Sequence, residues 1–242
     1  MKSEFNKRFF LSATLLCWFA VCLAQVKPGI KAGLNVSNVY QLNDGKKVGT
    51  QPNIGFQAGV TMDVPVSKSF FIQPGLLFST KGAYEEERTD GITARFTQTP
   101  FYIELPVNAV YALPVGRAAL LLGGGPYLAY GLGGTYKLRL KEGANTFTKE
   151  GSLRFKDDMS QQEVAELQNM QYWEDLPSQI TYARPFDLGI GVLAGFRFKE
   201  KWIIQYNAQA GILNLLPSVA GQKISNISMR STQFCISAGY LF

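Results

Sequence analysis

The chain has 242 residues and contains no histidine. That absence excludes triads of the Ser-His-Asp or Cys-His type and metal sites built on imidazole ligands. Charged residues are also scarce, at 17% against about 25% in ordinary soluble domains. The formal charge is +6, but no lysine and arginine cluster of the kind that follows nucleic-acid phosphates is present. We therefore expect no enzyme, no catalytic residue, no cofactor or metal, and no nucleic-acid partner.

The first 24 residues have the pattern of a signal peptide. Basic residues precede an apolar run at 9–23, and Cys22 and Ala24 supply small side chains before a cut at Gln25. An uncleaved anchor is the alternative, but the run is shorter than the about 20 residues of a spanning helix. Cleavage removes Cys17 and Cys22, so the mature protein keeps a single cysteine and has no internal disulfide.

The rest of the chain contains no apolar run long enough for a spanning helix. Eight segments instead alternate apolar and polar residues with the period of two that is typical of strands. The glycine-rich fifth segment has no clear phase. The eight segments lie near residues 30–40, 53–64, 70–81, 99–111, 118–138, 186–198, 202–212 and at the end of the chain, up to Phe242.

Three features favour a membrane barrel over a soluble, lipocalin-like binding barrel. The segments run for about ten residues or more, which suits a tilted strand crossing a bilayer. The polar face carries mainly glycine, glutamine and asparagine, which suits a narrow interior filled by side chains. The connections also alternate in length: 65–69, 112–117 and 199–201 are short, and 41–52, 82–98, 139–185 and 215–226 are long.

The predicted fold class is therefore all-β, an eight-stranded antiparallel up-and-down transmembrane β-barrel over residues 25–242. Both termini would lie in the periplasm, and the long loops would lie outside the cell. Four prolines fit poorly inside strands, so we expect bulges or strand ends at Pro74, Pro100, Pro106 and Pro126.

Several short motifs resemble the PorT-like outer membrane β-barrel proteins of Bacteroidetes. They are Tyr102-Ile-Glu104-Leu-Pro106, Gly124-Gly-Pro126-Tyr127, Phe186-Asp187-Leu-Gly189 and Gly195-Phe196. Their order and spacing extend the resemblance over essentially the whole mature chain. The resemblance implies an eight-stranded barrel in the outer membrane, and the founding member of that family is tied to protein secretion. The terminal Phe242, with Tyr240, looks like the aromatic signal that the barrel assembly machinery reads.

Six charged residues fall on the predicted interior face. They could form a proton or ion path, but an interior network of ion pairs and hydrogen bonds is favoured, since charges removed from water need partners. The six are Lys31, Asp63, Lys81, Glu104, Asp187 and Arg197. The acidic run 85–87 with Asp90 could bind a divalent cation, although a solvated loop is favoured.

The third long connection, 139–185, contains a capping box, Ser160-Gln-Gln-Glu163, which predicts a short helix over about 160–170. Tyr172 and Trp173 follow directly. This segment either lids the barrel mouth or forms a contact surface for a partner.

The sequence thus favours a non-enzymatic outer membrane barrel embedded in outer membrane lipid. Its loops would bind a surface or periplasmic protein, or serve an accessory role in envelope assembly or protein secretion. A small-solute transporter or narrow channel is the alternative.

Overall fold

The computed structural model describes residues 26–47, 49–89, 91–169 and 175–242. The expected signal peptide at 1–24 and the predicted contact residues Tyr172 and Trp173 lie outside this part. Among the described residues, no helix combines the length and the apolar character needed to cross a membrane. The described part is mostly strand, with a helix α2 at Gln161–Gln168.

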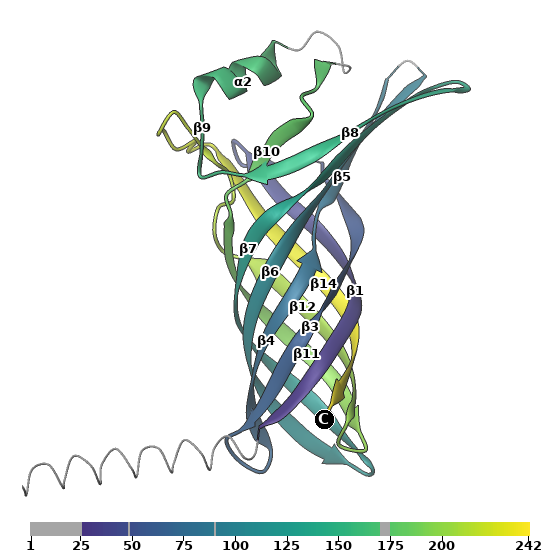
Figure 1. Cartoon of the computed structure of the whole chain (residues 1–242), viewed down its shortest axis with the longest axis vertical. Helices are drawn as coiled ribbons and strands as arrows, with labels where there is room; N and C mark the ends of the chain where they lie inside the picture. Colours follow the sequence, from purple (N-terminus) through teal and green to yellow (C-terminus); the bar gives the residue numbers. More distant parts are fainter. Residues whose placement is uncertain (1–25, 48, 90, 170–174) are drawn as a thin grey trace, which may run out of the picture.

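Eight long strands form a closed wall (Figure 1). In wall order they are β1 (Lys27–Asn43), β3 (Gln51–Pro65), β4 (Phe70–Thr80), β6 (Ile92–Val115), β7 (Ala118–Glu142), β11 (Phe186–Phe198), β12 (Trp202–Gly211) and β14 (Ile227–Leu241). Each pairs antiparallel with the next, and β14 pairs back onto β1, with Gly29 opposite Leu241. Each wall strand overlaps one of the predicted segments.

The sheet as a whole contains more strands than the wall. Short strands β2 (Lys46–Lys47), β5 (Ala83–Thr89), β8 (Asn145–Phe155) and β10 (Gln179–Ala183) join it, which gives twelve strands among the described residues. The predicted count of eight is therefore not confirmed for the sheet. A separate pair, β9 (Asp158–Met159) and β13 (Ser218–Val219), lies outside it.

The outer face of the wall is apolar. On β11, Leu188, Ile190 and Val192 are exposed while Asp187 is fully buried, which is the alternation that a strand period of two requires. Across the described wall, large apolar side chains such as Ile54, at 72% exposure, point outward. A band of this size would not remain in water, so it indicates contact with lipid.

Aromatic rings mark both edges of this apolar band. The upper girdle is defined by ring contacts on the side away from the termini: Phe56, Phe78, Phe101, Tyr130 and Phe186. The lower girdle lies beside the short turns and comprises Phe196, Phe198, Trp202, Tyr240 and Phe242. On β11 the two girdles are ten residues apart, as expected for a tilted strand that crosses the hydrocarbon core in about 9–11 residues.

The strands continue through the prolines rather than ending at them. Pairing between β4 and β6 skips from Pro74 to Leu77, and pairing between β6 and β7 skips from Pro106 to Ala109. A register shift occurs beside Pro100, where Phe101 is opposite Gly133 and Tyr102 is opposite Gly131. The expected strand ends are therefore absent, and this one bulge reverses the inward phase of β7.

Beyond the upper girdle the wall continues as a sheet on one side only (Figure 1). We call β5, β8, residues 92–99 of β6 and residues 135–142 of β7 the sheet extension. Its strands pair in the order β5–β6–β7–β8. The prediction of a loop at 82–98 was wrong for residues 83–89 and 92–98, which continue the antiparallel pairing. The acidic run 85–87 lies on β5, and Asp90 lies outside the described residues.

The segment between the sheet extension and β11 folds over the mouth of the barrel. Strand β10 returns parallel to β8, and α2 lies above it (Figure 1). Ser160 is the N-cap of α2 and forms the capping box with Glu163. Strands β9 and β13 join this segment to the connection before β14. We call residues 156–169 and 175–185 the lid.

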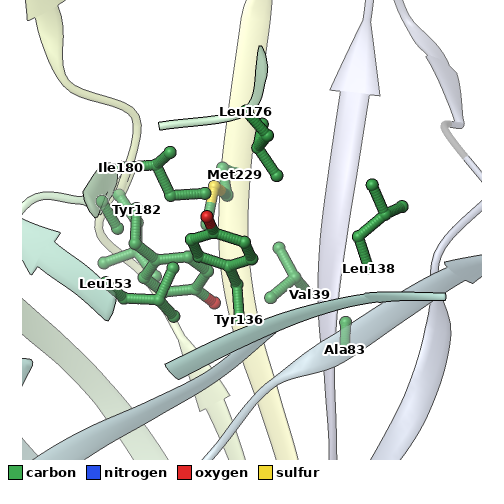
Figure 2. Packing of buried hydrophobic residues seen from close by; sticks show 11 residues of the cluster. Val39, Ala83, Tyr136, Leu138, Leu153, Leu176, Ile180, Tyr182 and Met229 are labelled. Carbon is green, nitrogen blue, oxygen red and sulfur yellow. The ribbon is translucent and has the colours of Figure 1, made fainter. Parts of the chain in front are cut away.

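A buried apolar cluster fixes the lid to the sheet extension (Figure 2). Tyr136 and Leu138 of β7 meet Leu176, Ile180 and Tyr182 of the lid. The Tyr136 hydroxyl also donates to the Pro177 carbonyl. The lid is therefore packed onto the sheet extension by apolar contact.

Candidate functional site

A buried ionic cluster closes the upper lumen. Lys81 follows β4 directly, and its ammonium lies 2.8 Å from Oε1 of Glu104 on β6 and 3.7 Å from Oδ2 of Asp187 on β11. Both carboxylates are fully buried, and the side chain of Lys81 is 4% exposed. The contact with Glu104 has the separation of a salt bridge but not the alignment of a hydrogen bond. The cluster therefore holds two carboxylates around one ammonium.

Aromatic and hydroxyl groups complete this cluster. The Lys81 ammonium lies 4.7 Å from the ring centroid of Tyr127 and 5.4 Å from that of Tyr102, within the range of cation–π attraction. Asp187 accepts hydrogen bonds from Ser231 Oγ at 2.6 Å and from the Tyr127 hydroxyl at 3.2 Å. These donors supply part of the stabilisation that buried charges require.

A second ion pair lies near the short turns. Arg197 Nη1 is 3.1 Å from Oδ2 of Asp63, and Gln73 Nε2 donates to the other carboxylate oxygen at 2.8 Å. Gln205 Nε2 donates to Gln73 at 3.4 Å. Amide side chains thus continue the polar contacts from this pair into the middle of the lumen.

Lys31 lies between the two ionic clusters and contacts amides instead of a carboxylate. Its ammonium donates to Oε1 of Gln205 and Oδ1 of Asn207, both at 3.2 Å. The structure therefore unites Lys81 with Glu104 and Asp187, and Asp63 with Arg197, while Lys31 belongs to neither salt bridge.

These side chains leave very little free space in the middle of the barrel. The cavity between Lys31, Gln57, Tyr127 and Gln209 has a volume of about 10 Å³, which is at the lower limit for one water molecule. The lumen is therefore filled at the level of these side chains, whereas a cavity of about 180 Å³ lies higher, between Val39, Gln98 and Tyr182.

Tyr127 and Ser231 were missed as partners of Asp187. Tyr127 was missed because the sequence did not show which residues of the fifth segment point inward. Gly189 could have indicated that Tyr127 points inward, because it is directly opposite Tyr127 on the neighbouring strand. A Cβ on Gly189 would lie 2.6 Å from Cε1 of the Tyr127 ring, so a glycine at this position makes room for an inward tyrosine.

Above the girdle, the acidic run on β5 divides between two faces. Glu86 is turned to the outer face and is shared by Arg95, at 2.7 Å, and Arg88, at 2.7 Å. These hydrogen bonds, that of Arg95 first, hold the pKa of Glu86 below its ordinary value. Glu85 and Glu87 lie on the inner face and line a cavity of about 290 Å³. Within the described ranges, no cluster suited to a metal ion is found.

Glu163 of α2 ties the lid to β8. Its carboxylate pairs with Arg154 and lies 2.6 Å from the Lys156 ammonium, and it accepts from the Ser160 backbone N–H at 2.9 Å. The hydrogen bond from Lys156, followed by that from Ser160, lowers the pKa of Glu163 to about 2. Glu163 therefore stays ionised at neutral pH.

The two residues predicted as the assembly signal lie in the lower girdle. The ring of Tyr240 contacts that of Trp202 edge to face at 4.9 Å and that of Phe242 at 5.4 Å. The Phe242 N–H donates to the Pro28 carbonyl at 2.9 Å. The end of the chain is thus joined to the beginning of β1.

Solved structures with a similar outline are outer membrane proteins. Ail of Yersinia pestis is 12% identical, with 90% of this chain and 99% of that chain covered and a TM-score of 0.36. Neisserial surface protein A is 8% identical, with 89% and 97% covered and a TM-score of 0.38. OprG of Pseudomonas aeruginosa is 11% identical, with 89% and 95% covered and a TM-score of 0.37. Identities and TM-scores this low carry no functional argument.

No curated protein matches the chain. The model of the outer membrane protein beta-barrel domain matches residues 23–216, which is most of the sequence. Together with the closed wall and its apolar outer face, this match establishes the family. The chain belongs to the outer membrane protein beta-barrel domain family, and its barrel is an outer membrane barrel.

Proposed function

We propose that this protein is a non-enzymatic outer membrane barrel that displays a binding surface and conducts no solute. The observation that carries the proposal is the filled middle of the lumen, where the cavity lined by Lys31, Gln57 and Gln209 has a volume of about 10 Å³. Eight strands enclose a space that side chains just fill, whereas porins need about 16–18. If the barrel is filled, binding would take place on the sheet extension and the lid.

In this proposal the eight wall strands are the transmembrane strands, and residues 1–24 are the signal peptide that exports the chain. Both ends of the wall sequence and the short turns lie at the lower girdle (Figure 1). With that end in the periplasm, the sheet extension and the lid face the outside.

The partner that we propose is a surface or periplasmic protein of the envelope. The resemblance to PorT-like barrels of Bacteroidetes supports an accessory role in protein secretion or envelope assembly. The aromatic pair Tyr240 and Phe242 would be read by the barrel assembly machinery during insertion.

Cysteine labelling in intact cells tests the orientation. An Asn145→Cys variant at the exposed tip of β8 should react with a membrane-impermeant maleimide. A Lys68→Cys variant in a short turn should react only after the outer membrane is opened. The unchanged chain is the background control, because Cys235 is buried. If only Lys68→Cys were labelled in intact cells, the orientation would be the opposite of the one proposed.

Photo-crosslinking tests partner binding. A crosslinker at Phe147, which is exposed on β8, should capture a discrete protein in intact cells. The same crosslinker at Lys68 serves as the matched control at the opposite end. Equal capture at both sites, or none at Phe147, would contradict a binding role for the sheet extension.

A further inference from the structure

The two faces of the sheet extension differ in charge. Residues directly opposite each other on neighbouring strands share a face, so the register assigns every charged side chain. The described outer face carries Arg88, Arg95, Lys137, Arg139, Lys141 and Arg154, the last paired with Glu163 of the lid, against Glu86 and Glu150. The described inner face carries Glu85, Glu87 and Glu142 against Lys149. The outer face is therefore basic and the inner face acidic.

Part of the basic charge on the outer face is not neutralised within the described protein. Glu150 pairs with Lys137 at 2.5 Å, and Glu86 is divided between two arginines. Neither Arg139 nor Lys141 forms a salt bridge with a described residue, and the electrostatic attraction of Arg139 to Glu150 is secondary to that of Lys137. Arg139 is instead directly opposite Arg95, an arrangement of like charges that destabilises a sheet unless an anion lies between them.

Threonines accompany Arg139 and Lys141. Arg139 is opposite Thr148 on β8, and Lys141 is opposite Thr146 on β8 and Thr93 on β6. Guanidinium groups bind phosphate through two parallel hydrogen bonds, and an ammonium adds a point charge. Hydroxyl groups beside them supply further donors. This set of side chains suits phosphate groups.

The basic face begins just above the membrane boundary. Thr97 and Arg95 precede Phe101 of the upper girdle by four and six residues on β6. At about 3.3 Å per residue and a tilt of about 45°, they stand about 9 Å and about 14 Å above that ring. Lys137 is opposite Thr97, and Arg139 is opposite Arg95. The headgroup layer begins at the girdle, and the outer face continues the lipid-facing side of the wall.

We propose that the outer face of the sheet extension docks onto phosphate-bearing headgroups of outer-leaflet lipid. Arg95 and Arg139 would share one phosphate, which removes their mutual repulsion, and Lys141 would contact a second. The lipid would hold the sheet extension against the membrane surface and leave its inner face free. This inference rests on the proposed orientation and is independent of partner binding.

Native mass spectrometry of the full barrel in neutral detergent tests the proposal. The probes are diphosphorylated lipid A, a glycolipid of the same acyl composition without phosphate, and inorganic phosphate. We expect lipid A to be retained at least tenfold more strongly than the phosphate-free lipid, and inorganic phosphate at equal concentration not to displace it. Added salt should weaken retention, because screening reduces attraction between exposed charges.

Paired variants locate the contact. Arg139→Gln with Lys141→Gln should weaken lipid A binding at least fivefold, because hydrogen bonds to charged groups are lost. Lys68→Gln with Arg117→Gln removes the same two charges from the exposed short turns and should change nothing. Equal loss in both pairs, equal retention of the phosphate-free lipid, or displacement by inorganic phosphate would each overturn the proposal. If lipid A binds as expected while Asn145→Cys, on the inner face that the lipid leaves free, is unreactive in cells, the orientation fails and the phosphate site stands.

Discussion

Replacing Lys81 by methionine removes the only cation of the upper ionic cluster and leaves Glu104 and Asp187 without their ammonium partner. Methionine keeps most of the apolar length of the side chain, so packing changes little. The substitution therefore isolates the charge, and we expect it to be among the most damaging single changes in the barrel.

The size of the effect follows from the two distances. At an effective dielectric constant of about 20, attraction is about 6 kcal/mol at the 2.8 Å separation from Glu104 and about 4 kcal/mol at the 3.7 Å separation from Asp187. Desolvation offsets much of this gain. Breaking a buried pair by removing one partner typically costs about 3–5 kcal/mol, and that is the expected decrease in the free energy of unfolding.

Urea unfolding of the purified barrel in lipid vesicles, followed by tryptophan fluorescence, measures this decrease. A matched triple variant, Lys81→Met with Glu104→Gln and Asp187→Asn, should recover most of the loss, because neutral groups need no counter-charge. A change below about 0.5 kcal/mol for Lys81→Met, which is the size of an ordinary surface substitution, would refute the reasoning.

Three further predictions concern the lid, the wall and the end of the chain. Because the pKa of Glu163 is lowered from 4.5 to about 2, its contribution to holding the lid is present above about pH 4.5 and lost as pH falls toward 2. Hydrogen exchange in 161–168 should rise over that range, and Glu163→Gln should abolish the pH dependence. Gly189→Val should prevent assembly of the heat-modifiable barrel, because its side chain meets Tyr127, whereas Gly49→Ala, in open space, should assemble normally. Deletion of Phe242 should reduce assembled barrel without reducing synthesis, and unchanged heat-modifiable protein in the membrane would show that this residue is no signal.

Alternation of apolar and polar residues was enough to predict the inward face of the regular strands. On β11, Asp187 alternates with Leu188 and Ile190, and the structure buries the carboxylate and exposes the aliphatic side chains. The same rule placed Glu104 and Lys81 among candidate interior residues. The alternation rule predicted which face of the strand each side chain occupies. It did not predict its ion-pair partner, because that depends on how neighbouring strands are staggered.

Alternation failed where the backbone changes phase. On β7 the inward side chains include Tyr127 below the bulge and Tyr136 above it, an odd and an even position. No single phase describes this strand, because the extra residue between Gly131 and Gly133 reverses it. The sheet extension was missed for a different reason. With glutamate, arginine and threonine on one face and few apolar residues on the other, 82–98 has the composition of a solvated loop, and only the pairing of β5 with β6 makes it strand.

Conductance in a planar bilayer tests the central claim of a closed wall with a filled lumen most directly. The lumen holds the Lys81 cluster, the Asp63–Arg197 pair and the amide side chains between them. We predict that the purified monomer gives no steady conductance of porin size. Reproducible large channels from the monomer would contradict the filled lumen and would make transport the leading function.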